Sequence, residues 1–543
     1  MKLTLALLSV CLCFNSLANI TSLQQRNITP ESFSVKFTSA AAGIGVLKYG
    51  TSPLSGSVVA GTDILNNHEI SLSGLVPASL YFVRAGVVIS PGDTLYSDVE
   101  PMMTASLSSG AIHVYFNGNV DHTEATIEPA ISLGQNFPDT IIAYLDRAKY
   151  TVDFTAYNID NQNGVIDAIN AAHNRGVQVR FVGNYGIANW NYNSISIGAG
   201  NKIQRPEGDD IGAMHNKFIV IDADSPDPND PFVITGSTNF TNNQLRFDPN
   251  NLIIFQDQSL ARCFTIEFEE MFSGVFGQAK SVKTPSEFMI GGKRVQALFS
   301  PKSGVENELL QHIAQADFDI YFGIFTLTRA NISQALVDRS NDGVFVAGIV
   351  QDINTSSNTF TILQNGLGNR LVLDAFSTMW HHKYAIFDPN CSDGRPIAYT
   401  GSANWSVNGN ARSDENVVVV YDENIANQYF QEFMSRYKAH NVNEFVSGEC
   451  DVVHSITEHI QAGGLRVFPN PSTGQFFVDP PTATPGNLQV FDSSGQLVKR
   501  LAFSSTGDVE PVSLSGFTSG LYFLLWQDVS GSNAQSGKVV LAD

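Results

Sequence analysis

Two segments of the 543-residue chain carry the same unusual pattern: a histidine, a lysine two positions later and an aspartate five positions after that. A Gly-Ser-x-Asn sequence follows each copy. The residues are His215, Lys217 and Asp222 with Ser237 and Asn239 in the first copy, and His381, Lys383 and Asp388 with Ser402 and Asn404 in the second. The histidines are 381 − 215 = 166 positions apart, and this recurrence indicates an internal duplication.

These residue types suit phosphodiester cleavage. The reaction needs a nucleophile, a proton donor for the leaving oxygen, and positive charge at the phosphoryl oxygens. Two histidines can divide the first two tasks, because imidazole titrates near neutral pH. Lysine and asparagine side chains can supply the third. Neither copy is complete alone, so we expect both to form one pocket, with no metal or other cofactor.

The two segments resemble the HKD motifs of the phospholipase D superfamily, and the downstream Gly-Ser-x-Asn element is similar too. The resemblance covers roughly residues 112–440. It implies a two-step mechanism in which His215 attacks phosphorus and forms a phosphohistidine. His381 would then protonate the leaving alcohol and afterwards activate water. The two copies are so alike that these two roles could be exchanged.

The resemblance also implies roles for the other motif residues. Those expected to hold phosphate oxygens are Lys217, Lys383, Asn239 and Asn404, with Ser237 and Ser402 as further candidates. The two motif aspartates, Asp222 and Asp388, are expected to orient or tune a histidine. His382 adjoins the second motif, but only His381 fits its spacing.

One departure from the family pattern distinguishes the two halves. The family often places an acid further downstream to support the opposite histidine. Glu415 can fill that role in the second half, whereas Asn250 at the corresponding place in the first half cannot carry the charge. The sequence leaves open which histidine is affected.

Alternating strand and helix patterns indicate an α/β domain around the motifs. Strand patterns at 148–157 and 316–325 differ by 168 positions, close to the offset of the histidines, and each is followed by a helix and a further strand. We therefore expect two pseudo-symmetric α-β-α halves, residues 112–280 and 290–445, in a duplicated phospholipase D-like fold.

Both flanking regions have β patterns, and we expect each to form a β-sandwich. Residues 19–105 resemble a fibronectin type III domain, because a Leu-x-Pro turn leads into a strand that carries Tyr81. Residues 465–543 resemble the C-terminal sorting domain of the type IX secretion system. Their Pro-Asn-Pro-Ser-Thr-Gly start, Asp-x-x-Gly hairpin and Gly-Leu-Tyr-Phe strand carry that resemblance.

Residues 1–18 have the features of a signal peptide: one lysine, a short apolar run and a small-x-small end. We expect an exported protein, secreted or at the cell surface, that acts as a monomer and uses the type IX machinery. Without the signal, three cysteines remain. Cys391 is expected to pair with Cys450, and Cys263 to lie in a core.

The substrate is predicted from charge and location. The formal net charge of −21 disfavours non-specific binding to nucleic acid, and export favours an external substrate. The first hypothesis is a secreted phospholipase D-type hydrolase that releases a head-group alcohol. The alternatives are a secreted metal-independent nuclease and a surface-binding protein with an inactive core. Four aromatic side chains could line a lipid pocket or stack bases: Trp190, Tyr192, Trp380 and Trp405.

Overall fold

The computed structural model describes most of the chain from Ile20 onward and divides it into two compact units, Met1–Cys450 and Asp451–Asp543. The residues outside the description are 1–19, 54–55, 187–190, 207, 209–211, 282–283, 352–357, 392–393, 441–464, 469, 471, 480–485, 493–496, 504–509, 529–533 and 543. The predicted signal peptide therefore lies outside the described residues.

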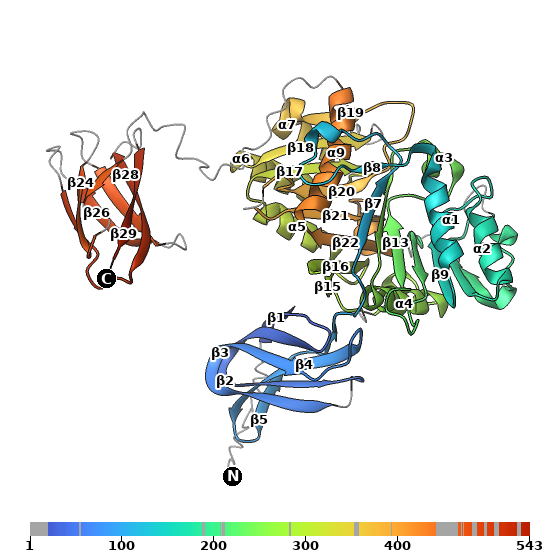
Figure 1. Cartoon of the computed structure of the whole chain (residues 1–543), viewed down its shortest axis with the longest axis horizontal. Helices are drawn as coiled ribbons and strands as arrows, with labels where there is room; N and C mark the ends of the chain where they lie inside the picture. Colours follow the sequence, from blue (N-terminus) through green and yellow to red (C-terminus); the bar gives the residue numbers. More distant parts are fainter. Residues whose placement is uncertain are drawn as a thin grey trace, which may run out of the picture. The chain divides into compact units, whose positions relative to one another are not determined.

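The first half of the α/β region is one sheet in the order β11-β10-β9-β12-β13-β14-β7-β8 (Figure 1). Its strands are β7 (Ile112–Phe116), β8 (Ile131–Ser132), β9 (Thr151–Ala156), β10 (Gln178–Gly183), β11 (Lys202–Gln204), β12 (Phe218–Ile221), β13 (Phe232–Gly236) and β14 (Asn251–Phe255). Its helices are α1 (Phe137–Arg147), α2 (Val165–Asn174), α3 (Asn242–Arg246) and α4 (Gln258–Phe272).

The second half repeats this arrangement in the order β19-β18-β17-β20-β21-β22-β16-β15. Its strands are β15 (Glu287–Ile290), β16 (Lys293–Ser300), β17 (Asp319–Ile324), β18 (Phe345–Gln351), β19 (Leu371–Asp374), β20 (Lys383–Phe387), β21 (Ile397–Gly401) and β22 (Glu415–Tyr421). Its helices are α5 (Val305–Gln315), α6 (Ala330–Asn341), α7 (Asn358–Leu367), α8 (Val407–Ala411) and α9 (Glu423–Ala439).

Seven strands of each sheet match in order and direction, so the predicted duplication is confirmed. The edge strands differ, because β8 runs parallel to β7 whereas β15 runs antiparallel to β16. In the first half β9 and β10 run parallel, as β17 and β18 do in the second half. The motif strand of each half, β12 or β20, pairs antiparallel with β9 or β17. The equivalence extends to helix starts. Asp257 caps α4 by accepting the N–H of Leu260 at 2.8 Å, and Asp422 caps α9 by accepting the N–H of Ile425 at 3.0 Å.

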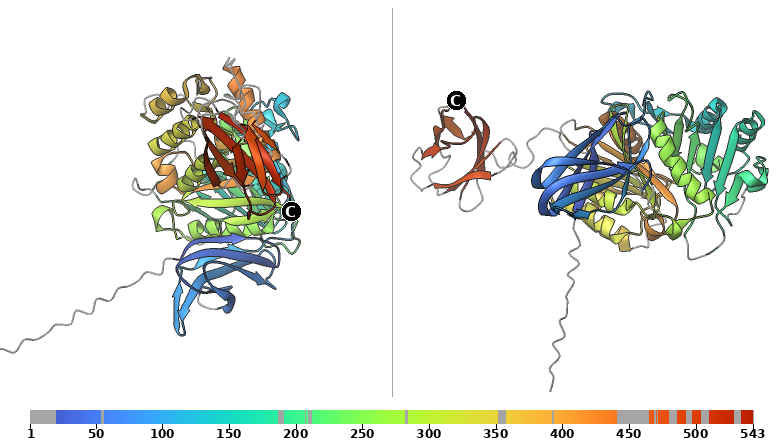
Figure 2. Two further views of the ribbon diagram at one scale, coloured as in Figure 1. Left: turned by 90° about the vertical axis from the view of Figure 1, so that its left-hand side faces the viewer. Right: turned by 90° about the horizontal axis from the view of Figure 1, so that it is seen from below.

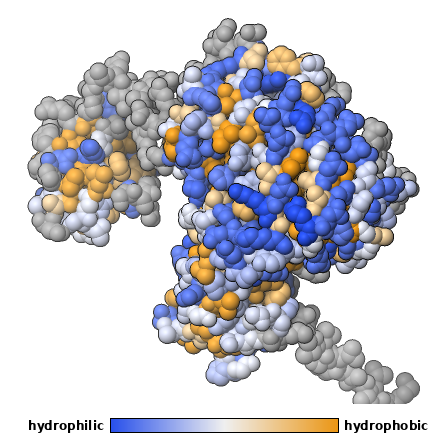
Figure 3. Space-filling view, turned by 45° about the vertical axis from the view of Figure 1, so that its right-hand side comes forward, coloured by the Kyte–Doolittle hydropathy of each residue, from blue (hydrophilic) through white to orange (hydrophobic). Residues whose placement is uncertain are grey.

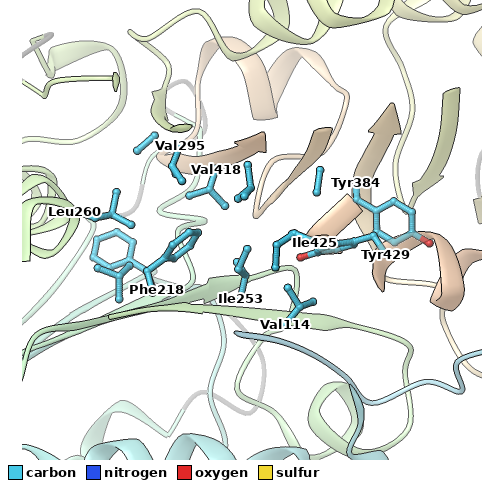
Figure 4. Close-up of a cluster of buried hydrophobic side chains, with 14 of the residues drawn as sticks. Val114, Phe218, Ile253, Leu260, Val295, Tyr384, Val418, Ile425 and Tyr429 are labelled. Atoms are coloured by element: carbon cyan, nitrogen blue, oxygen red, sulfur yellow. The ribbon is translucent and has the colours of Figure 1, made fainter. Parts of the chain in front are cut away.

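The α/β domain has three hydrophobic cores, one within each half and one shared between them. One packs α1 and α2 on the outer face of the first sheet, and another packs α5, α6 and α7 on the outer face of the second (Figure 2). The third core lies between the sheets and is shared. Figure 4 shows Phe218 and Ile253 of the first half close to Val418, Ile425 and Tyr429 of the second. Because apolar area from both halves is buried in this core, the two motif strands have a fixed relation.

The N-terminal region is a six-stranded sheet wrapped around its own core. The strands are β1 (Ile20–Arg26), β2 (Ser32–Gly50), β3 (Ser57–Ser73), β4 (Leu80–Ser90), β5 (Asp93–Tyr96) and β6 (Glu100–Met103). The Tyr81 hydroxyl accepts the backbone N–H of Val76 at 2.9 Å, which is the contact of a tyrosine corner. The strands are as expected, while membership of the fibronectin type III family stays a prediction.

This region is joined to the α/β domain through helix α4. Arg262 donates to the carbonyl of Ala78 at 2.6 Å, and the Ser259 hydroxyl donates to the carbonyl of Thr104 at 2.9 Å. A signal for these contacts is hard to find in the sequence, because the paired residues lie more than 150 positions apart.

The C-terminal unit contains two sheets over one core, β23-β24-β27 and β26-β25-β28-β29. Its strands are β23 (Arg466–Phe468), β24 (Gln475–Asp479), β25 (Gly486–Phe491), β26 (Leu497–Phe503), β27 (Glu510–Ser513), β28 (Gly520–Asp528) and β29 (Ala534–Leu541). The two sheets cover one hydrophobic core, and the β-sandwich expected for each flanking region stays a prediction.

Two of the three cysteines that follow the predicted signal peptide are among the described residues. Cys391 is disulfide-bonded and Cys263 is a buried free thiol, as expected for these two residues. The predicted partner, Cys450, lies outside the described residues.

Among the residues described, no helix is both long and apolar enough to cross a membrane. On the face shown in Figure 3, hydrophilic residues cover most of the α/β domain, and hydrophobic ones are scattered among them.

Candidate active site

The motif histidines lie just before the motif strands and not within them. Strand β12 begins at Phe218, and β20 begins at Lys383. The alternation predicted from the sequence still holds there. His215 and Lys217 both lie beside the ring of Tyr157, whereas the residue between them, Asn216, is buried against Glu267 and Met271.

His215 is held by a carboxylate from the opposite half. Its Nδ1 lies 2.7 Å from Oε2 of Glu415, the first residue of β22. The Ser402 hydroxyl donates to the same oxygen at 2.6 Å. Burial raises the pKa of Glu415 to about 8, against the opposing charge of Lys217 and the hydrogen bond from Ser402. Because burial favours the neutral form of both partners, the pair is suited to share one proton.

His381 is held in the same way by an amide. Its Nδ1 lies 3.1 Å from Oδ1 of Asn250, which precedes β14, and the Ser237 hydroxyl donates to that oxygen at 2.9 Å. The supporting residue again comes from the opposite half. The question left open by the sequence is thus answered: Glu415 supports His215, and the uncharged Asn250 supports His381.

The two motif lysines lie in the same buried centre. Lys217 Nζ donates to the carbonyl of His215 at 2.7 Å, and Lys383 Nζ donates to that of His381 at 2.8 Å. Burial lowers the pKa of Lys217 to about 7. Burial together with the charge of Lys217 lowers the pKa of Lys383 well below its usual range. The charge of Glu415 opposes both shifts, but the two lysines outnumber this one carboxylate.

The pKa shifts also show that both motifs face one centre. Burial lowers the pKa of His215, and the charges of Lys217 and Lys383 lower it further. Burial also lowers the pKa of His381, followed by the charges of Lys383, Lys217 and His215. The pKa of each histidine is thus lowered by cationic side chains from both halves. The backbone agrees, because the N–H of His215 donates to Asp414 at 2.9 Å and that of His381 to Pro249 at 3.1 Å.

Two aromatic residues at this centre were missed in the sequence. The ring of Tyr157 lies 4.4 Å from the ring of His215, and that of Phe325 lies 4.7 Å from that of His381. Lys217 Nζ and Lys383 Nζ lie over these two rings, at 5.2 and 5.4 Å from the centroids. Both aromatics directly follow equivalent strands, β9 and β17, so the duplication itself was the signal that could have revealed them.

The motif aspartates do not contact the histidines, and the expected role for them is wrong. The Asp222 carboxylate accepts the backbone N–H groups of Lys149, Tyr150 and Thr151 at 2.7–2.8 Å. Asp388 binds the start of β17 in the same way, through three N–H groups at 2.8–3.1 Å. Each aspartate comes after its motif strand, whereas the histidine comes before it. Both residues therefore fix strand ends, and their φ angles of 52° and 47° mark sharp turns.

The asparagines of the two Gly-Ser-x-Asn elements share one feature: Oδ1 of both Asn239 and Asn404 is buried with no hydrogen-bond partner among the described residues. Asn239 is held through its N–H groups, because its backbone and side-chain nitrogens lie 3.2 and 3.3 Å from Gln244 Oε1. An amide whose oxygen has no partner can turn over and present its N–H groups to a phosphate oxygen.

Two of the four aromatic side chains proposed for substrate contact, Trp380 and Trp405, are in the wrong place. Trp380 and Trp405 are buried, in the shared core and in the second half's outer core respectively. Tyr192 packs against Phe181, and Trp190 lies outside the described residues. His382 is buried as well, 3.0 Å from Glu432 and 3.0 Å from Asn251, and so belongs to the core rather than to the pocket.

Within the described residues, no group of three or more histidine, cysteine, aspartate or glutamate side chains is arranged to hold a metal ion.

Comparison with known proteins agrees with this geometry. Residues 141–272 and 309–437, one segment from each half, match the family described as "Cardiolipin synthase, PLD-like domain". The central domain belongs to the phospholipase D superfamily. The two matched segments correspond to the two halves seen in the sheets.

The relatives of this phospholipase D-like domain match parts of the chain at low identity. Phospholipase D of Rickettsia prowazekii is 26% identical over 154 residues, 28% of this chain and 71% of the relative. Mitochondrial cardiolipin hydrolase of Mus musculus is 30% identical over 105 residues, 19% of this chain and 44% of the relative.

Two solved structures show weaker likeness. Phosphatidylserine synthase of Haemophilus influenzae has a TM-score of 0.42 at 12% identity, covering 56% of this chain and 85% of that one. NUC of Salmonella typhimurium, described as a phospholipase D family member, has a TM-score of 0.23 at 23% identity, covering 26% of this chain and 93% of that one.

Residues 466–541 match a "Secretion system C-terminal sorting domain". The predicted sorting domain of the type IX secretion system is thus confirmed. It indicates export, with the protein secreted or at the cell surface.

Proposed function

We propose that the protein is a secreted phospholipase D-type phosphodiesterase, which hydrolyses a phospholipid to phosphatidic acid and a free head-group alcohol. The observation that carries the proposal is the meeting of both motifs in one buried, cationic centre, with each histidine held by a side chain of the opposite half. A phosphodiester anion supplies the charge that Lys217 and Lys383 lack there.

The proposed reaction has two steps. The Nε2 lone pair of His215 attacks phosphorus, the bond to the head-group oxygen breaks, and that oxygen takes a proton from His381. A phosphohistidine and the free alcohol result. His381 then removes a proton from water, the water oxygen attacks phosphorus, and the P–N bond breaks to restore His215. The lysines and the asparagines Asn239 and Asn404 hold the phosphoryl oxygens.

Several observations favour a lipid over a nucleic acid. The protein is exported and carries a net charge of −21, and the two relatives named above are a phospholipase D and a cardiolipin hydrolase. Two exposed apolar side chains also lie near the site. Phe247 and Met379 are 49% and 40% exposed, three residues before Asn250 and two residues before His381. The N–H of Met379 donates to Asp248, which brings the two segments together.

A leaving-group experiment tests both the reaction and the roles. The purified protein is given phosphatidylcholine and phosphatidyl-p-nitrophenol, whose leaving group departs without a proton. Replacing His215 with alanine should abolish product from both substrates, because no nucleophile remains. Replacing His381 with alanine should abolish choline release, yet leave one stoichiometric burst of p-nitrophenol. Rapid quench and mass spectrometry should then find phosphate on His215.

Three outcomes would contradict the proposal. Phospholipids that stay intact while DNA is degraded would favour the nuclease alternative. Unchanged cleavage by the His215→Ala variant would remove the histidine mechanism, and complete inactivity of the wild type on both classes would favour the binding protein with an inactive core.

A further inference from the structure

The two histidines have partners of the same geometry and different charge. Both Nδ1 atoms face an oxygen that comes from the start of a β-strand in the opposite half and that also accepts a serine hydroxyl. The oxygen belongs to a carboxylate for His215 and to an amide for His381. This difference is local, since the strands that carry these residues and their neighbours in the sheet are duplicated in order and direction.

The orientation of the amide follows from its other contacts. Asn250 Nδ2 lies 3.1 Å from the carbonyl of Gln244 and 2.9 Å from that of Asp248. Carbonyl oxygens only accept, so the nitrogen of the amide must face them and its oxygen must face His381. An oxygen that only accepts requires a proton on Nδ1 of His381. The Nε2 of His381 is thereby the atom that gains and loses a proton in the pocket.

The charged groups around His381 oppose its protonation. Lys383 Nζ lies 3.2 and 3.3 Å from its two ring nitrogens, and Lys217 and His215 add positive charge from the other half. The nearby carboxylates have other partners. Asp248 accepts the N–H of Met379, and Glu432 lies against His382 and Tyr384. Among the described residues, the ring of Phe325 also lies beside His381, 4.7 Å from its ring, and carries no charge.

The groups around His215 include a carboxylate, and a backbone hydrogen bond with Ser402 also raises the pKa of this histidine, against the effect of burial. His215 too faces Lys217 and Lys383, and the ring of Tyr157 lies beside it. However, Glu415 lies at 2.7 Å and can balance positive charge on the ring. A histidine whose Nε2 carries a phosphoryl group keeps its Nδ1 proton and is positively charged. A carboxylate stabilises this state, whereas an amide does not.

We propose that Asn250 and Glu415 are positioning residues that divide the catalytic roles. Glu415 makes His215 the histidine that is phosphorylated, and Asn250 makes His381 the proton donor, a strong acid that is charged only while a phosphodiester anion occupies the pocket. The inference rests on the proposed phosphodiesterase function and goes beyond it, since it states which residue pair fixes the order of the steps and the pH window.

The test is the isosteric exchange Asn250→Asp. A carboxylate beside His381 raises the pKa of that histidine by about 1–3 units, so protonated His381 persists to higher pH. Single-turnover cleavage of phosphatidylcholine at alkaline pH should rise by about tenfold for each unit of that shift. The burst of p-nitrophenol from phosphatidyl-p-nitrophenol should not change, because that leaving group needs no proton.

The exchange Glu415→Gln should act on the other step. Without the carboxylate, the charged phosphohistidine is less stable, so the first step should slow for both substrates to a similar extent, by about tenfold to a hundredfold. This variant also carries the test if Asn250→Asp does not fold.

Asn251→Asp is the matched control. It places the same new carboxylate on the next residue of the chain, whose side chain faces the buried His382 instead of the pocket. It should leave the difference between the two leaving groups unchanged, and thermal unfolding of all variants shows whether they are folded.

Three results would overturn the inference. Two of them concern a folded Asn250→Asp protein: cleavage of both substrates changes equally, or the pH dependence of phosphatidylcholine cleavage does not shift. The third is a Glu415→Gln protein in which only phosphatidylcholine cleavage slows, which would mean that the roles of the two histidines are reversed. If the wild type cleaves no lipid, the same comparison with a nucleotide p-nitrophenyl phosphodiester separates failure of this inference from failure of the lipid assignment.

Discussion

At the scale of single residues, the pocket is short of negative charge. Lys217, Lys383 and His381 are buried, and the His215 side chain is 13% exposed. Among the described residues, the carboxylate at this centre is that of Glu415, and burial raises its pKa to about 8. Burial disfavours every charged form, so the lysines and histidines of the free site hold fewer protons than they would hold in water, whereas Glu415 holds its proton to higher pH. A phosphate anion reverses this, because its charge favours protonation of the lysines beside it.

Anion binding should therefore take up protons. Between about pH 7 and the usual range of lysine, Lys217 with its pKa of about 7 is largely neutral in the free protein and gains a proton when phosphate binds. Titration calorimetry with inorganic phosphate in buffers of different ionisation enthalpy measures this uptake. The apparent binding enthalpy should depend on the buffer, and Lys217→Met should weaken that dependence. Equal enthalpies in all buffers would contradict the prediction.

At the scale of elements, the repeated aspartate is a structural part of the motif. Asp222 and Asp388 each tie the end of a motif strand to the start of the neighbouring antiparallel strand through several N–H groups. The strand after the histidine is thus fixed at its far end. That contact places the histidine and lysine at the near end, although the aspartate itself does not enter the pocket.

Replacing Asp222 with alanine should cost stability much more than catalysis. The buried carboxylate accepts three N–H groups, and hydrogen bonds to a charged group each contribute about 1.5–3 kcal/mol. We expect a loss of about 3 kcal/mol or more, seen as a lower unfolding temperature, with kcat of the folded fraction within a few-fold of wild type.

Asp224→Ala is the control for this prediction. Its side chain is 79% exposed, and its pair with Arg262 is a surface ion pair of little energetic weight. A large loss of kcat in folded Asp222→Ala, with no loss of stability, would restore a catalytic role for the aspartate.

At the scale of the whole molecule, the proposed active site and the sorting domain belong to separate units. All of the proposed active site lies in the unit Met1–Cys450, and the sorting domain lies in the other unit. Each unit has its own hydrophobic core. Cores that are independent of one another allow one unit to fold without the other.

A chain that ends at residue 450 should keep its phosphodiesterase activity and lose export. Activity on phosphatidylcholine after purification, and the distribution of the protein between cells and medium, are the two measurements. Full-length His215→Ala is the opposite control, because it should be exported without activity. Truncated protein that unfolds, or that is exported normally, would contradict this division.

The sequence alone was sufficient for whatever is encoded locally. The spacing within each motif, the repeat of that spacing and the strand and helix patterns led to the duplicated α/β fold, to the phospholipase D superfamily and to the sorting domain. It also led to Glu415 and Asn250 as the point where the halves differ.

Only the tertiary structure decided how these residues are combined. The partner of His215 is 200 positions away and that of His381 is 131 positions away, so neither pairing is encoded in local spacing. The same holds for two predictions that were wrong. Asp222 and Asp388 bind neighbouring strand starts, and Trp380 and Trp405 fill cores, because strand pairing and burial are properties of the packed sheets. The motifs determine the chemistry, and the packing of the two halves decides which side chain performs each part of it.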